Sequence, residues 1–125
     1  MGKRAVDSGG NFARGLELFN GGQFFACHEA WEASWKRSDG LDRQFVQGLI
    51  QAAAAILHVE RGNLNGAAST WRKARARLDP LADDYGAIAL GELRAALARF
   101  FAIALGGGDL PPRPQIRRLA LRSDL

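Results

Sequence analysis

The stretch from His28 to Trp35 contains the side chains of this sequence that are best suited to bind a ligand or a metal ion. A histidine, two carboxylates and two indoles fall within it. In a helix, His28 and Glu32 stand four residues apart on one face, where their side chains can touch. An imidazole and a carboxylate at this spacing can chelate a divalent metal ion. The sequence therefore indicates a site, with His28 and Glu32 as its candidate metal ligands.

The number of donors near this stretch leaves the metal hypothesis incomplete. The order of residues resembles the H-E-x-x-H pattern of zinc peptidases, but Glu32 stands where that pattern has its second histidine. A structural zinc site needs about four protein ligands, and a catalytic one about three. Two interpretations stay open: a polar network that only satisfies buried groups, and a site for a metal or small ligand. For Cys27 we predict a place in the core.

Apolar residues recur at three and four positions along most of the chain, which is typical of amphipathic helices. The spacing predicts helices over residues 11–19, 23–36, 42–61 and 64–78, and a last helix from about 93 to 104. Asn11 is expected to cap the first helix, and an irregular connection is expected over residues 81–91. Strand signals are missing. The sequence thus predicts an all-α fold of about five helices in a compact orthogonal or antiparallel bundle.

A hairpin between the second and third predicted helices would bring further polar residues towards the motif. If the chain turns near Gly40, the numbers of opposing residues sum to about 78 to 80. His28 then lies at the level of Gln51, and Glu32 at the level of Gln47. His58 falls about 10 Å further along the helix axis at 1.5 Å per residue. Gln47 and Gln51 are therefore the expected neighbours of the motif.

Length and composition are those of a single globular domain. Of the 125 residues, 47% are hydrophobic and 24% are charged, which are ordinary values for a folded protein. We expect a flexible lead-in over residues 1–10, one helical domain over 11–105, and a tail over 106–125 rich in Gly, Pro and Arg. The basic start has no signal-peptide core behind it, and the longest apolar run is too short for a membrane span. A cytoplasmic protein without a membrane anchor is expected.

The positive charge raises the question of an acidic partner. The formal net charge is +4, and Lys and Arg near phosphates drive nonspecific binding to nucleic acids. However, the basic residues of segment 64–78 surround their helix instead of forming one stripe, and aromatic residues do not alternate with them. Binding to nucleic acid therefore ranks below binding to a small ligand or to a protein.

Several motifs in order resemble those of a bacterial and archaeal protein family, the domain of unknown function numbered 309. That family carries the pattern H-x-x-x-E-x-x-W or Y, then Q-G-L-I-Q, a histidine, a G-N turn and a G-A pair. The matching residues here are His28, Glu32 and Trp35, then 47–51, then His58, Gly62, Asn63, Gly66 and Ala67. The resemblance extends over about residues 12–105. It implies a small helical protein, and it suggests metal binding at the His/Glu motif.

Three hypotheses for the function follow. The first is a buried polar pocket that binds a small ligand or a divalent metal ion. Its expected residues are His28, Glu32, Trp35, Gln47, Gln51 and His58. The second is a protein-interaction module in which the His/Glu motif only fixes the fold. The third is a weak nucleic-acid binder.

Overall fold

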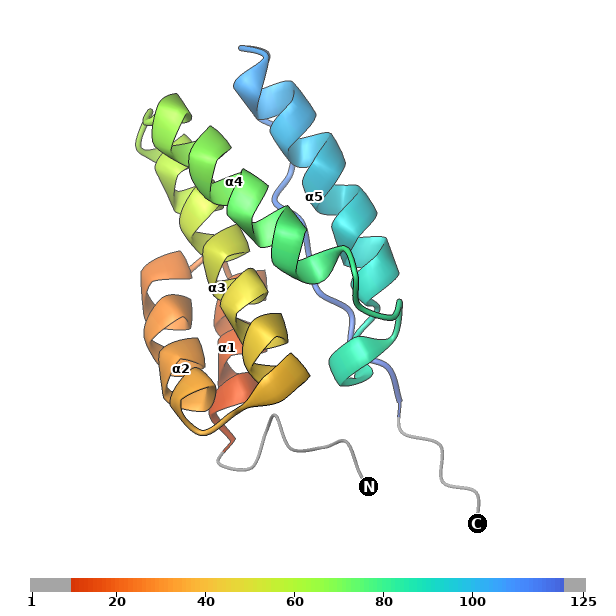
Figure 1. The fold of residues 1–125 in the computed structure, drawn as a ribbon. Helices are drawn as coiled ribbons and strands as arrows, with labels where there is room; N and C mark the ends of the chain where they lie inside the picture. The colour runs from red at the N-terminus through yellow and green to blue at the C-terminus, as the bar shows by residue number, and fades with distance from the viewer. Residues whose placement is uncertain (1–9, 121–125) are drawn as a thin grey trace.

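Five α-helices and one short 3-10 helix make up the part of the chain that the computed structural model describes, residues 10–120 (Figure 1). The elements are α1 (Asn11–Asn20), α2 (Phe24–Lys36), α3 (Gly40–Glu60), α4 (Leu64–Leu78), η2 (Tyr85–Ala87) and α5 (Leu90–Leu105). Within these residues the only extended pairing is an isolated bridge between Ile88 and Arg118. The prediction of an all-α fold of about five helices is confirmed. The predicted lead-in lies, except for residue 10, outside the described residues.

The first two helices pack around Trp31, which is fully buried. Its ring stacks on Phe12 and lies at a tilt to Phe19, both of α1, with ring centroids 6.1 and 5.8 Å away. Its Nε1–H donates to the backbone oxygen of Phe12 at 3.1 Å. A Cβ at Gly15 would lie 2.1 Å from that nitrogen, so glycine at this position allows the indole to approach α1. The polar edge of the indole is thereby satisfied inside the core.

The central helix is α3, which lies between α2 and α4 (Figure 1). Buried residues occupy several of its sides, as predicted from its many small and apolar residues. It packs tightly on α4 at Gly48, where a Cβ would lie 2.6 Å from Leu78. A larger residue would force α4 outward or Leu78 into another rotamer. Gly48 therefore sets the spacing between α3 and α4.

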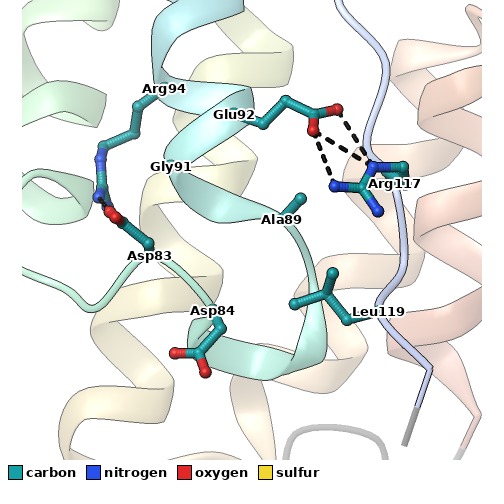
Figure 2. A pocket seen from close by; sticks show the side chains of 8 residues that line it. All are labelled: Asp83, Asp84, Ala89, Gly91, Glu92, Arg94, Arg117 and Leu119. Atoms are coloured by element: carbon teal, nitrogen blue, oxygen red, sulfur yellow. Dashed lines mark hydrogen bonds and ion pairs between the residues drawn. The ribbon is translucent and has the colours of Figure 1, made fainter.

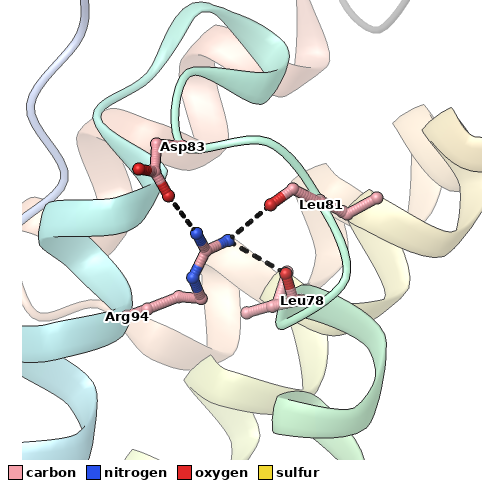
Figure 3. Close-up of polar contacts among 4 residues, drawn as sticks. All are labelled: Leu78, Leu81, Asp83 and Arg94. Carbon is pink, nitrogen blue, oxygen red and sulfur yellow. Dashed lines mark hydrogen bonds and ion pairs between the residues drawn. The ribbon is translucent and has the colours of Figure 1, made fainter.

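The end of α4 is fastened to α5 by Arg94 (Figure 3). Its guanidinium donates to the backbone oxygens of Leu78 and Leu81, at 3.0 Å each, and pairs with Asp83. The last carbonyls of a helix have no partner within the helix. Arg94 supplies one and so fixes the irregular connection that the sequence predicted here.

The segment after α5 runs back along the helical body (Figure 1). Ile116 is buried, and its backbone N–H and C=O bond to the side-chain amide of Asn20 at 2.7 and 2.9 Å. Arg113 pairs with Glu60 at 3.0 Å, and Arg117 with Glu92 at 2.9 Å. Residues 113–118 thus contact α1, α3 and α5, and Ile116 belongs to the core.

One predicted helix cap and two predicted helix starts are wrong. The N-cap of α1 is Gly10, not Asn11; its φ of 80° lies in the left-handed region, which suits glycine. The third helix begins at Gly40 instead of residue 42, and α5 begins at Leu90 instead of about 93. A backbone turn formed by glycine does not alter the spacing of apolar residues, so this spacing does not reveal where such a helix begins. Among residues 10–120, no helix is both long and apolar enough to cross a membrane.

Candidate functional site

The motif on α2 lies at the edge of the core. The buried line of this helix is Phe24, Cys27, Trp31 and Ser34. His28 is only half-buried and Glu32 is exposed. The prediction of a buried polar pocket with His28 in the core is therefore wrong. The reason is the position of α1, because Trp31 points to that helix and turns the buried face of α2 away from His28.

The register between α2 and α3 follows from a contact between Trp35 and Arg43. The guanidinium carbon of Arg43 lies 3.8 Å from the centroid of the Trp35 ring. These residue numbers, which sum to 78, fit the predicted hairpin, whose opposing positions sum to about 78 to 80. In that register Glu32 is at the level of Gln47, and His28 is near the level of Gln51. Both glutamines are half-buried.

We call this set of residues the motif face: His28, Glu32 and Trp35 of α2, with Gln47 and Gln51 of α3. The polar network that was one of the two open interpretations of these residues is not formed. The Oε1 atom of Gln51 accepts from Arg77 Nε of α4 at 3.0 Å. In the described part of the chain, no hydrogen bond or ion pair involves the side chain of His28 or Glu32. These two groups remain accessible and unpaired there.

The donor set for a metal is limited to the two predicted ligands. Residues 10–120 contain no group of three or more His, Cys, Asp or Glu side chains that could hold an ion together. His28 and Glu32 can supply one imidazole nitrogen and one carboxylate. Any further donors at this face would come from water or from a ligand.

His58, the sixth predicted site residue, is part of a different structure, the turn between α3 and α4. Its Nδ1 lies 3.1 Å from the side-chain nitrogen of Asn63. The side-chain oxygen of Asn63 in turn accepts from the backbone N–H of Gly66 at 3.0 Å and caps α4. A Cβ at Gly66 would lie 2.5 Å from the Asn63 amide, so a glycine leaves room for this cap. His58 thus supports a helix terminus and is separate from the motif face.

Cys27 is fully buried beside the motif. Desolvation raises the pKa of its thiol to about 12, so the thiolate that would act as a nucleophile or metal ligand is scarce near neutral pH. The prediction that Cys27 fills a place in the core is confirmed.

A separate hollow of about 420 Å³ opens at the start of α5 (Figure 2). Its charged lining is largely paired within the fold: Arg117 with Glu92, and Arg94 with Asp83. The hydrogen bond from Arg117 lowers the pKa of the Glu92 carboxyl. A ligand would have to displace these partners, so the hollow is a weaker candidate for a site than the motif face.

Two residues beside the motif face were missed by the sequence analysis, Arg43 and Arg77. Arg43 stacks on Trp35, and Arg77 is held by Gln51 and also by Gln44, whose Nε2 donates to the Arg77 backbone oxygen at 3.0 Å. The spacing of Arg43, one turn before Gln47, could have indicated its place. Arg77 carried no such signal, because its position depends on how α4 packs on α3.

Part of the chain is similar to a known protein family. Residues 12–70 match the family described as Domain of unknown function (DUF309). The chain is also similar to an uncharacterized protein of Aquifex aeolicus (strain VF5), with 28% identity over 100 residues. That alignment covers 79% of this chain but 29% of the relative, so the chain spans less than a third of that protein. The matched segment ends before residue 105, where the resemblance was expected to end. It contains nearly all of α1, the whole of α2 and α3 and the start of α4, so the similarity to the DUF309 family lies in this part of the chain.

Proposed function

We propose that this protein binds a small polar ligand on the motif face. The observation that supports this most directly is the state of His28 and Glu32, which are accessible, one helical turn apart, and unpaired within residues 10–120. We place this binding in the cytoplasm, because the single cysteine is buried and no part of the chain requires an oxidising compartment.

Three further residues of the family pattern, Gly48, Asn63 and Gly66, support this proposal by contrast. Gly48 sets the α3–α4 spacing, and Asn63 caps α4 with room provided by Gly66. Each of these has a structural role. His28 and Glu32 form no contact of that kind among the described residues, so the stability of the fold does not account for their polar groups.

The chemistry of the motif face suits a ligand with both donors and acceptors. The Glu32 carboxylate accepts hydrogen bonds, His28 can donate or accept according to its tautomer, and the glutamine amides can do both. The Trp35 ring supplies an apolar edge. A divalent metal ion could join such a ligand to the chain through His28 and Glu32, with water or the ligand completing its coordination.

A binding screen on the full chain tests this proposal. Thermal shifts and calorimetry are measured with Zn²⁺, Mn²⁺, Ni²⁺ and Fe²⁺, and with sets of amino acids, sugars and nucleotides. We expect at least one compound or ion to stabilise the wild type, and the effect to be lost in Glu32→Gln. Glu29→Gln is the matched control, because Glu29 is an exposed carboxylate on the same helix outside the motif face. If nothing binds, or if Glu32→Gln binds equally well, the proposal is wrong.

A protein-interaction role is the second candidate, and exposed apolar side chains favour it. Phe25 of α2 is 64% exposed and Leu41 of α3 is 57% exposed, and a partner that covered them would remove this apolar surface from water. A defined partner that binds wild type and Glu32→Gln equally, but not Phe25→Ser, would favour this role over ligand binding.

A further inference from the structure

We propose that the ligand of the motif face is a small organic anion, and that Arg43 and Arg77 bind its carboxylate or phosphate group. This inference rests on the proposed function and specifies the chemical class of the ligand. It follows from two guanidinium groups that are fixed beside the motif face by uncharged partners.

Arg43 and Arg77 are both held in place without a carboxylate. Arg43 lies 3.8 Å from the centroid of the Trp35 ring, and Arg77 Nε donates to Gln51 Oε1 at 3.0 Å. The ion pairs among residues 10–120 use other arginines, namely Arg75, Arg94, Arg113 and Arg117. Both positive charges beside the motif face therefore remain unneutralised there. The two side chains are also partly fixed already, so a ligand that binds them has less conformational freedom to restrict.

The groups that remain between them are mostly hydrogen-bond donors. Because Gln51 Oε1 accepts from Arg77, its amide nitrogen and the two terminal nitrogens of Arg77 are left to bind a ligand. Gln47 lies one turn beyond Arg43 and one turn before Gln51 on α3. Guanidinium groups bind carboxylate and phosphate oxygens with paired hydrogen bonds. The set therefore fits an anionic group near Gln47.

The opposite edge of the motif face sets a second requirement for the ligand. Glu32 is exposed and lies at the level of Gln47, so a purely anionic molecule would be repelled at that edge. A ligand with an acidic group towards the arginines and a donor, such as an amine or hydroxyl, towards Glu32 satisfies both edges. The class we infer is thus a small carboxylate or phosphate that also carries a donor group.

Calorimetric titration of the full chain with inorganic phosphate and with malonate tests the anionic part. Sodium chloride keeps the ionic strength equal in all titrations. At least one anion should bind saturably, and Arg43→Gln and Arg77→Gln should each weaken that binding by about tenfold or more. The control is Arg72→Gln, an exposed arginine on another side of α4, for which we expect a change below about twofold. Whichever anion binds more tightly indicates whether the acidic group is a phosphate or a carboxylate.

A second variant, Gln51→Glu, tests the role of Arg77 if Arg77→Gln does not fold. Gln51→Glu places a carboxylate beside Arg77 and neutralises its charge while keeping a hydrogen-bond acceptor there. We expect it to weaken anion binding at an unchanged melting temperature. A short single-stranded oligonucleotide serves as a third probe. If it binds more tightly than both small anions and without dependence on Arg77, the assignment to a small ligand is overturned.

The outcomes separate this inference from the proposed function. If neither phosphate nor malonate binds, or if Arg72→Gln weakens binding as much as Arg77→Gln, the anionic class is wrong. Should an uncharged or cationic compound then bind in a Glu32-dependent way, ligand binding at the motif face still stands. If no compound binds at all, both proposals fail.

Discussion

The two histidines of the chain, His28 and His58, lie on neighbouring helices, and the fold uses them differently. His58 is bonded to Asn63, which caps α4 and is accommodated by Gly66. His28 stands at the edge of α2 without a polar partner among the described residues. Both residues belong to one family pattern. The difference indicates that such a pattern can combine residues that stabilise the fold with residues that lie at the surface without a stabilising contact.

A similar contrast exists within α2 itself. One face carries Cys27 and Trp31, which are fully buried, and the other carries Glu32 in solvent. Neighbouring positions in the sequence thus belong to different environments. The packing of the indole on Gly15 determines which side of α2 faces water.

The largest expected difference is in thiol reactivity on the two sides of α2. We compare alkylation of Cys27 in the wild type with alkylation of a cysteine placed at position 32 in Cys27→Ala/Glu32→Cys. Because burial raises the pKa of Cys27 to about 12, its thiolate is roughly a thousandfold scarcer near neutral pH than that of an exposed thiol. Mass spectrometry should show rapid labelling at position 32 only. Similar rates under native conditions would contradict the assignment of the two faces.

Removal of the α4 cap should have the next largest effect. Asn63→Ala deletes the acceptor for the Gly66 N–H and the group bonded to His58. We expect the free energy of unfolding to fall by about 1 to 2 kcal/mol, measured by urea denaturation. Asn65→Ala is the control, since Asn65 is exposed on the same helix. Equal losses in both variants would show that the cap does not stabilise the turn.

Coupling within each histidine pair distinguishes the two regions more directly. A double-mutant cycle of His58→Ala and Asn63→Ala should give a coupling energy of about 0.5 to 1.5 kcal/mol, as expected for one hydrogen bond. The same cycle with His28→Ala and Glu32→Ala should give a value near zero without ligand. A large coupling between His28 and Glu32 would instead favour the fold-fixing role of the motif.

The ion pair between Glu92 and Arg117 should give the smallest effect. The hydrogen bond from Arg117 lowers the pKa of the Glu92 carboxyl below its usual value of 4.5. The pair therefore stabilises the fold above about that pH, and this contribution is lost as the pH falls through the lowered pKa. Both groups are exposed, so the effect is small. Glu92→Gln should flatten the acid limb of the pH–stability curve, and an unchanged limb would contradict this role.

Much of the fold could be predicted from the sequence because each helix is marked by the regular spacing of its own apolar residues. The apolar stripe of Phe45, Leu49, Ala52, Ile56 and Val59 marked α3, and every residue of it is buried. The hairpin arithmetic also gave a register that the Trp35–Arg43 contact fits. Helix starts were less predictable, since Gly10 and Gly40 begin helices through backbone geometry that leaves no apolar signal.

The details of the candidate site depended on contacts between distant residues. His28 shares an apolar stripe of α2 with Phe24, Trp31 and Trp35. The local sequence does not show that Cys27 is buried there and His28 is not. The docking of α1 decides this, through Trp31 and Gly15. In the same way, the place of Arg77 beside Gln51 depends on how α4 crosses α3. The buried position of Ile116 depends on Asn20, which lies 96 residues away in the sequence.

The most direct test of this account is the unfolding free energy of the double variant His28→Gln/Glu32→Gln in ligand-free buffer. If these side chains serve binding and not folding, urea denaturation should give a value within about 0.5 kcal/mol of the wild type. A loss of more than about 1.5 kcal/mol would show that the motif stabilises the fold, and would contradict its assignment as a ligand-binding face.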